Sequence, residues 1–249
     1  MPSFLRNALF FALLLGSLQG AAYTNELMVY RMSWMGTTIG EMTLSSSIST
    51  NGALLRSMRV RSRSWARLFS SLDDTVTCES CGEGAALRRV VRKRVSEDGF
   101  EQDDRLVLWP NRGLAVFDAG DGVCTTSSVP VGLEDMVTFF YDLRDLAPAR
   151  TNGMPLAGVR NLVMDGVAHE IALTTGPVVR VDVPWGEADA LSVEAESHSD
   201  GLFVRNVPRA IRIGLSPPAL LSMEIEHGGH TVHVRLRDWL RDGAPVSPR

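Results

Sequence analysis

Lysine is almost absent from this chain of 249 residues: Lys93 is the only lysine among 25 basic residues. The net charge is −4, so there is no surplus of positive charge to displace counterions from nucleic-acid phosphates. We therefore expect no general nucleic-acid binding. GC-rich coding bias explains the arginine excess better than selection for forked contacts to anions.

Long apolar runs are missing after the N-terminal segment. That segment combines Arg6, the apolar run 8–15 and the small residues Gly20-Ala21-Ala22, which is typical of a secretory signal peptide cleaved after Ala22. The run is too short to span a bilayer, and the cleavage point lacks the cysteine that lipid anchoring requires. We expect residues 1–22 to be a signal peptide and the mature protein to be periplasmic or secreted in a bacterium, with no transmembrane span.

Recognisable catalytic and cofactor motifs are also missing. The chain has no Gly-x-Ser-x-Gly setting, no phosphate-binding loop and no dinucleotide fingerprint. His227, His230 and His233 are three residues apart, which puts neighbours on opposite faces of a strand and favours exposed hairpin histidines over a metal site. We expect a non-enzymatic protein with neither metal nor cofactor.

Cysteine occurs three times, and Cys78-Glu79-Ser80-Cys81 is the most suggestive chemical motif. A redox-active pair of this spacing usually begins a helix, which lowers the pKa of the first thiol. Here the motif follows strand residues and runs into Gly82, so a structural disulfide between Cys78 and Cys81 is the favoured interpretation in an oxidising compartment. Pairing of one of them with Cys124, unpaired or metal-bound thiols, and a redox-active pair are the alternatives.

Period-two alternation of apolar residues dominates the chain and predicts strands with one buried face. Turn dipeptides that accept positive φ separate the strands and predict tight antiparallel hairpins. The segment 87–95 fits either a helix or a strand, and its valines favour a strand that carries Arg89 and Lys93 on the same face as Val91. The dipeptides are Asn51-Gly52, Asp98-Gly99, Asp165-Gly166, Asp200-Gly201 and Gly228-Gly229.

One segment has a helical period instead. An apolar stripe from Leu133 to Leu143 predicts a helix over 132–146, with Glu134 and Asp135 in its first turn and Pro148 as its stop. We expect an all-β, mainly antiparallel fold of about a dozen strands around this central helix. The predicted organisation is one domain over 23–243, with a possible boundary between sub-sheets near 148–154, and a disordered tail over 244–249.

In order and spacing, these segments resemble the DUF3108 family of exported bacterial proteins. The resemblance starts with the opening strands around Tyr30 and Gly40, and continues in a central helix marked by Asp135, Tyr141, Leu143 and Arg144. It extends through the strands from Val163 to Val193 and the C-terminal hairpins from Ile211 to Leu236. One departure is Pro217-Pro218 after Ser216, where the family tends to have acidic residues. The resemblance implies a strongly curved sheet or barrel-like shape and export, and it implies no established activity.

The aromatic residues Trp34, Trp185 and Phe140 are the candidates for a binding face on such a curved sheet. The leading hypothesis is non-enzymatic binding of an apolar or amphipathic component of the cell envelope, such as a lipid. The alternatives are a structural or adaptor protein that docks on an envelope protein through a sheet edge, and a thiol-active redox protein. An unfilled cavity would favour the first hypothesis, and a packed core with an exposed apolar patch would favour the second.

Overall fold

The structure is a computed structural model that describes residues 25–66, 71–120, 122–150, 158–164, 166–197, 208–227 and 230–246. The predicted signal peptide, residues 1–22, lies outside these ranges. The elements follow in the order β1 (Asn25–Trp34), β2 (Thr37–Ile48), β3 (Leu54–Ser62), β4 (Asp73–Cys81), β5 (Arg88–Glu97), β6 (Phe100–Trp109), β7 (Leu114–Asp118), β8 (Cys124–Ser128), β9 (Glu134–Asp135), α2 (Met136–Arg150), β10 (Gly158–Met164), β11 (Val167–Val183), β12 (Gly186–Ser197), β13 (Pro208–Leu215), β14 (Pro218–His227), β15 (His230–Arg241) and β16 (Ala244–Pro245).

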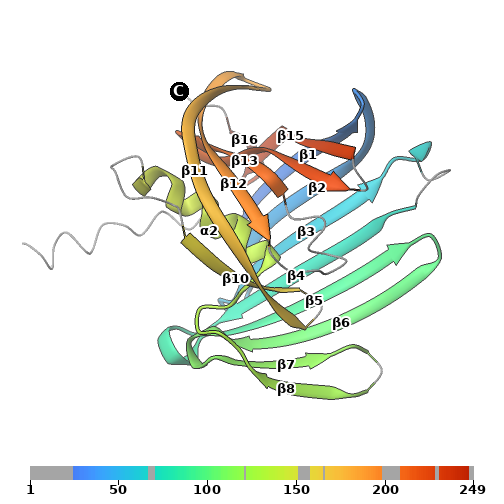
Figure 1. Cartoon of the computed structure of the whole chain (residues 1–249), viewed down its shortest axis with the longest axis vertical. Coiled ribbons are helices and arrows are strands. Elements are labelled where there is room, and N and C mark those ends of the chain that lie inside the picture. Colours follow the sequence, from blue (N-terminus) through green and yellow to red (C-terminus); the bar gives the residue numbers. More distant parts are fainter. Residues whose placement is uncertain are drawn as a thin grey trace, which may run out of the picture.

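All strands belong to one 16-stranded sheet (Figure 1). Its order is β8-β7-β6-β5-β4-β3-β2-β1-β15-β14-β13-β12-β11-β10-β9, with β16 added beside β15. Every pairing is antiparallel except that of β9 with β10. The expected fold class, mainly antiparallel all-β with one central helix, is therefore confirmed. The sheet curls without closing, because β8 and β9 stay at opposite ends of the pairing order.

The hairpins follow the predicted turn chemistry. Asp98 and Gly99 have φ of 46° and 87° and join β5 to β6, as a tight hairpin with positive φ at both turn residues requires. Met35 and Gly36 form a second turn of this kind, with φ of 48° and 79°. Segment 88–97 is a strand, as its valines indicated. The turns predicted at 200–201 and 228–229 lie outside the described residues.

The helix begins and ends four residues later than predicted. Residues 134 and 135 form β9, which pairs in parallel with Leu162 and Val163 of β10. Asp135 is therefore not in the first turn: its Oδ1 accepts the backbone N–H of Thr138 at 3.0 Å and caps the helix from outside. The helix also continues past Pro148 to Arg150, so the proline interrupts one backbone bond near the end rather than stopping the helix.

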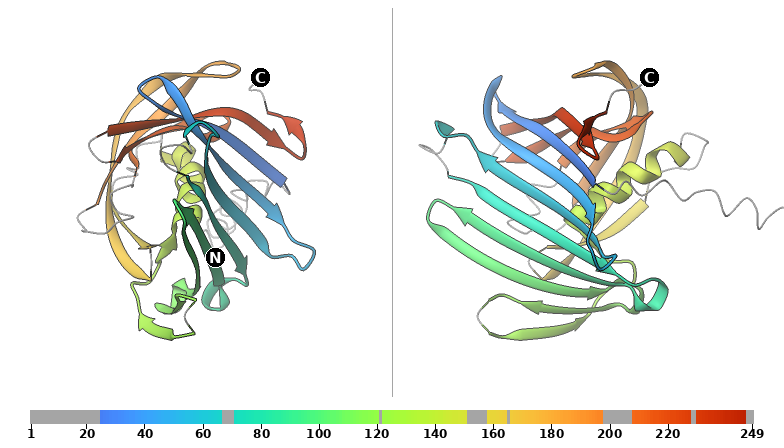
Figure 2. Two further views of the ribbon diagram at one scale, coloured as in Figure 1. Left: turned by 90° about the vertical axis from the view of Figure 1, so that its right-hand side faces the viewer. Right: turned by 180° about the vertical axis from the view of Figure 1, so that it is seen from behind.

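Helix α2 lies within the curve of the sheet (Figure 2), where it packs on β9, β10, β13 and β14 and on β3 and β4. Its apolar side chains Val137, Phe139, Phe140 and Leu143 are almost fully buried against the concave face of the sheet. Among the residues that the structure describes, no helix has the length and apolar character needed to cross a membrane.

The C-terminal end corrects another expectation. Residues 244 and 245, predicted to begin a disordered tail, form β16 and pair with Leu240 and Arg241. A turn at Asp242 and Gly243, with φ of 48° and 78°, returns the chain onto β15. Residues 247–249 lie outside the described ranges.

Candidate binding cleft beside helix α2

Two arginines point inward from the sheet because they lie in phase with buried apolar residues. Arg56 is two residues from Met58 on β3, and Arg89 is two residues from Val91 on β5. Side chains two apart on a strand share a face, so both guanidinium groups lie on the concave side. Ser80 of β4, directly opposite Arg89, lies between these two strands.

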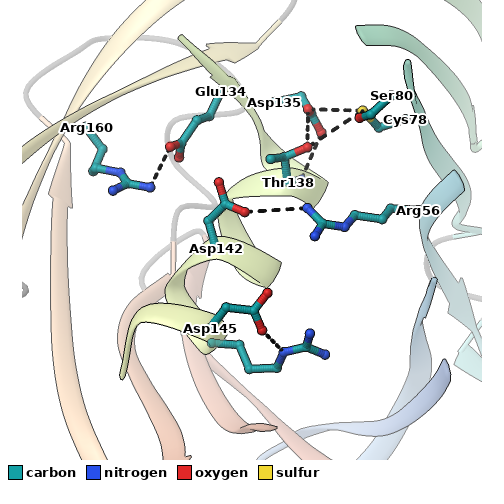
Figure 3. Close-up of polar contacts among 10 residues, drawn as sticks. Arg56, Cys78, Ser80, Glu134, Asp135, Thr138, Asp142, Asp145 and Arg160 are labelled. Carbon is teal, nitrogen blue, oxygen red and sulfur yellow. Dashed lines mark hydrogen bonds and ion pairs between the residues drawn. The ribbon is translucent and has the colours of Figure 1, made fainter. Parts of the chain in front are cut away.

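Helix α2 supplies the facing wall. The guanidinium carbon of Arg56 lies 4.7 Å from the centre of the Tyr141 ring, a cation–π contact that holds the group flat. One of its terminal nitrogens is 3.5 Å from Oδ1 of Asp142 (Figure 3), a long ion pair. Burial raises the pKa of Asp142. Nearby guanidinium groups, first that of Arg56, lower this pKa, but burial has the larger effect.

A cleft of about 480 Å³ opens between these two walls. Its lining mixes polar backbone, arginine and carboxylate groups. Its lining residues are Gly52, Leu54, Arg56, Ser80, Cys81, Gly82, Glu83, Leu87, Arg89 and Asp142. Such a lining suits a polar or charged ligand group better than an alkyl chain.

A second ion pair lies at the start of the helix, where Arg160 of β10 contacts Glu134 (Figure 3). Burial raises the pKa of Glu134 to about 7, against the lowering effect of Arg160. The carboxylate of Asp142 adds to this rise. The base of the helix thus holds a carboxyl group that titrates near neutral pH.

A buried polar cluster fixes the first turn of α2 to β4. The Thr138 hydroxyl donates to Oδ2 of Asp135 at 2.6 Å, and the Cys78 thiol donates to the same oxygen at 3.3 Å (Figure 3). Burial, and then the Asp135 carboxylate, raise the pKa of Cys78 to about 12. This thiol stays protonated at neutral pH and acts as a hydrogen-bond donor.

The far part of the helix is held by a buried carboxylate on β1. Glu26 contacts Arg144 of α2, and its Oε1 accepts Trp239 Nε1 at 2.9 Å and Arg241 Nε at 3.1 Å. Glu26 is in phase with Met28 and Tyr30, which places its charge among apolar side chains. Because its partners satisfy it, the pair anchors α2 inside the sheet.

A cavity of about 50 Å³ lies where the two ends of the sheet approach each other, lined by Phe117, Met136, Val163 and other mostly apolar groups. A Cβ on Gly166 would lie 2.8 Å from the Phe117 ring, so the β10–β11 turn packs directly on β7. This space is far too small for an acyl chain.

The expected disulfide is not formed, because all three thiols are free. Cys78 and Cys81 lie three residues apart on β4, which turns their side chains to opposite faces. Cys124 lies on β8, four strands from β4, or roughly 19 Å at the usual strand spacing, well beyond bonding reach. The pair lies at the end of β4 and begins no α-helix, and its first thiol is buried, which disfavours a redox-active pair.

The three candidate aromatics do not form one binding face. Phe140 is buried in the core and packs on Phe139. Trp34 lies opposite Val232 on β15, whereas Trp185 packs on Trp239, seven residues further along that strand. At the usual rise this separates the two tryptophans by roughly 23 Å.

Sequence reasoning did not identify Arg56 or Arg160 as members of a site. A signal was present: each is in phase with apolar residues of its own strand, as Arg56 is with Met58 and Arg160 with Leu162. Of the four family-motif residues, Leu143 fills the core and the other three make polar or cation–π contacts. Asp135 caps the helix, Tyr141 supports two guanidinium groups, and Arg144 binds Glu26.

Comparisons with known proteins support the fold. No protein-family model matches the chain, and the search of curated proteins found no match, so the resemblance to DUF3108 stays a prediction. Among solved structures, the chain is similar to the beta-barrel-like protein of domain of unknown function DUF1849 from Brucella abortus. The TM-score is 0.60 at 10% identity, over 87% of this chain and 97% of that one. At that identity the likeness shows a barrel-like β-domain and nothing further.

Proposed function

We propose that the protein is an exported, non-enzymatic binding protein that holds an amphipathic component of the bacterial envelope at the cleft beside α2. One observation carries the proposal: helix α2 packs on the concave side of the sheet, and a polar cleft of about 480 Å³ opens beside it. The predicted signal peptide supports export to the periplasm. The helix on the concave side directs the ligand's polar end to the cleft and leaves its apolar part outside the sheet.

The chain offers a matched pair of thiols for the test. Cys81 lines the cleft, and Cys124 lies on β8 at one end of the sheet; both are exposed. A polyethylene glycol maleimide on Cys81, in a Cys124→Ser background, covers the mouth of the cleft from its rim. The same label on Cys124, in a Cys81→Ser background, is the control.

Native mass spectrometry of the mature protein with an envelope lipid extract supplies the readout. We expect a 1:1 adduct with the unlabelled protein and with the Cys124-labelled control, and none with the Cys81-labelled protein. An absence of adduct in every sample would refute the binding function, and equal adducts in all three would place the ligand elsewhere.

A second function, docking on an envelope protein, is favoured by one observation. All five residues of β8 are exposed, and among the described residues this strand pairs only with β7. Such an edge can accept a strand from another protein. A photo-cross-linking amino acid at Thr126 in living cells should give one defined protein adduct, whereas the same group at exposed Glu187 of β12 should give none. Equal patterns at both positions would contradict docking through β8.

A further inference from the structure

The geometry of the cleft arginines suggests which chemical group they bind. Arg56 and Arg89 project from β3 and β5, on either side of β4. Arg56 lies opposite Cys78 and Arg89 opposite Ser80. Two strand spacings and this two-residue offset separate their backbones by roughly 12 Å, so two arginine side chains can converge on a small group above Ser80. Both side chains line the same open cleft.

Each of these guanidinium groups has an unmet hydrogen bond. The Nε atoms of Arg56 and Arg89 are buried and have no acceptor among the described residues. A buried donor without an acceptor costs free energy, and the cost is larger for a charged group. The Arg56 side chain is only 14% exposed, so bulk solvent screens it little.

The carboxylates of the cleft do not accept hydrogen bonds from these two Nε atoms. Asp142 approaches Arg56 only at 3.5 Å, and Glu83 is exposed at the rim. Two guanidinium groups and one adjacent hydroxyl present several donors from three neighbouring strands. That arrangement fits a compact oxyanion with two negative charges and acceptors on several sides.

We infer that the cleft binds a dianionic oxyanion of the phosphate or phosphate-monoester type, between the guanidinium groups of Arg56 and Arg89. The inference rests on the proposed function in placing the ligand at this cleft, and it names the chemistry of the ligand's polar end. Asp142 opposes the bound anion and lowers its affinity. A free phosphate and the headgroup of a phospholipid share this chemistry.

The Nε–H groups of Arg56 and Arg89 can be observed directly by NMR, so they report on ligand binding. In two-dimensional ¹⁵N NMR of the mature protein, the Arg Nε–H signals of Arg56 and Arg89 are assigned by their loss in the Arg56→Lys and Arg89→Lys variants. Arg94 is the control: it lies on β5 with its side chain 67% exposed and paired with Asp103. Titrants are inorganic phosphate, dihexanoyl phosphatidic acid, dihexanoyl phosphatidylcholine and sodium chloride at matched ionic strength.

We expect both cleft signals to shift together with a single saturation curve, and the Arg94 signal to stay in place. Affinity should fall at least tenfold in Arg56→Gln and in Arg89→Gln, rise several-fold in Asp142→Asn, and stay unchanged in Arg94→Gln. Saturation by inorganic phosphate as tight as that by phosphatidic acid identifies free phosphate as the ligand. Tighter binding of phosphatidic acid identifies a lipid headgroup.

Two results would overturn the inference: no shift with either phosphate compound, or shifts shared by Arg94 and reproduced by sodium chloride. The proposed function fails separately. A lipid adduct without these NMR shifts refutes the oxyanion site alone. Shifts without any envelope adduct refute the envelope function and leave the oxyanion site standing.

Discussion

Burial separates Cys78 from the other two thiols. Cys78 has no exposed surface, and its pKa is raised to about 12 by burial and the nearby Asp135 carboxylate, whereas Cys81 and Cys124 are exposed. Because the thiolate is the reactive form, a thiol reagent at neutral pH should modify two cysteines in the native protein and the third only on unfolding. Cys81→Ser and Cys124→Ser should each remove one fast-reacting thiol. A native protein with a single reactive thiol would instead indicate a disulfide.

The second residue-scale prediction concerns Glu134. Burial raises its pKa from 4.5 to about 7, so the folded protein holds this proton more tightly than the unfolded chain does. The stabilisation is therefore fully present below pH 4.5 and is lost as the pH rises to 7. Relative to the Glu134→Gln variant, the wild type should lose on the order of 2–3 kcal/mol over this range.

Urea unfolding of both proteins at pH 4.5 and pH 8 measures this difference. Other titrating groups, such as Asp74, whose pKa burial raises to about 6, are present in both proteins and largely cancel. A free-energy difference that is independent of pH would contradict the raised pKa of Glu134.

At the residue scale, sequence reasoning identified side chains better than it identified their partners. The strand interpretation of 87–95 already placed Arg89 on the buried face. Nothing in the local sequence could show that Asp142, 53 positions away along the chain, would face it across the cleft. Such pairings depend on how the sheet curls, which period-two alternation does not encode.

At the scale of the element, the start of α2 shows why its boundary was predicted wrongly. The apolar stripe from Leu133 is genuine, but residues 134 and 135 pair with β10, more than twenty-five residues later. This long-range pairing overrides the local helical preference, and the helix begins where Asp135 can cap it. Local patterns thus located the helix and could not fix its first turn.

The cap yields a prediction for this element. Asp135→Ala removes the acceptor for the Thr138 N–H and leaves the buried Thr138 and Cys78 donors without their partner. We expect a loss of about 2 kcal/mol in the free energy of unfolding. Asp135→Asn keeps a side-chain oxygen for the cap and should lose clearly less. Equal losses in the two variants, measured by urea unfolding, would show that the cap contributes nothing.

At the scale of the whole molecule, alternation and turn dipeptides were enough to predict a curved antiparallel meander. They could not predict that one sheet would carry sixteen strands, or that α2 would occupy its concave side. The inward charges Glu26 and Arg144 pair across 118 positions of the chain and fix the helix there. The concave side of the sheet is therefore occupied by α2, with a polar cleft beside the helix.

The central claim, that a ligand binds at the cleft while α2 stays in place, can be tested by locking the helix to the sheet. The Thr138 hydroxyl oxygen lies 3.7 Å from the Cys78 sulfur, so Thr138→Cys, with Cys81→Ser and Cys124→Ser, should allow a disulfide between positions 78 and 138. Native mass spectrometry with the envelope extract then compares the oxidised protein with the same protein after reduction. We expect the same adduct in both. Loss of the adduct on oxidation and its return on reduction would show that the ligand enters by displacing α2.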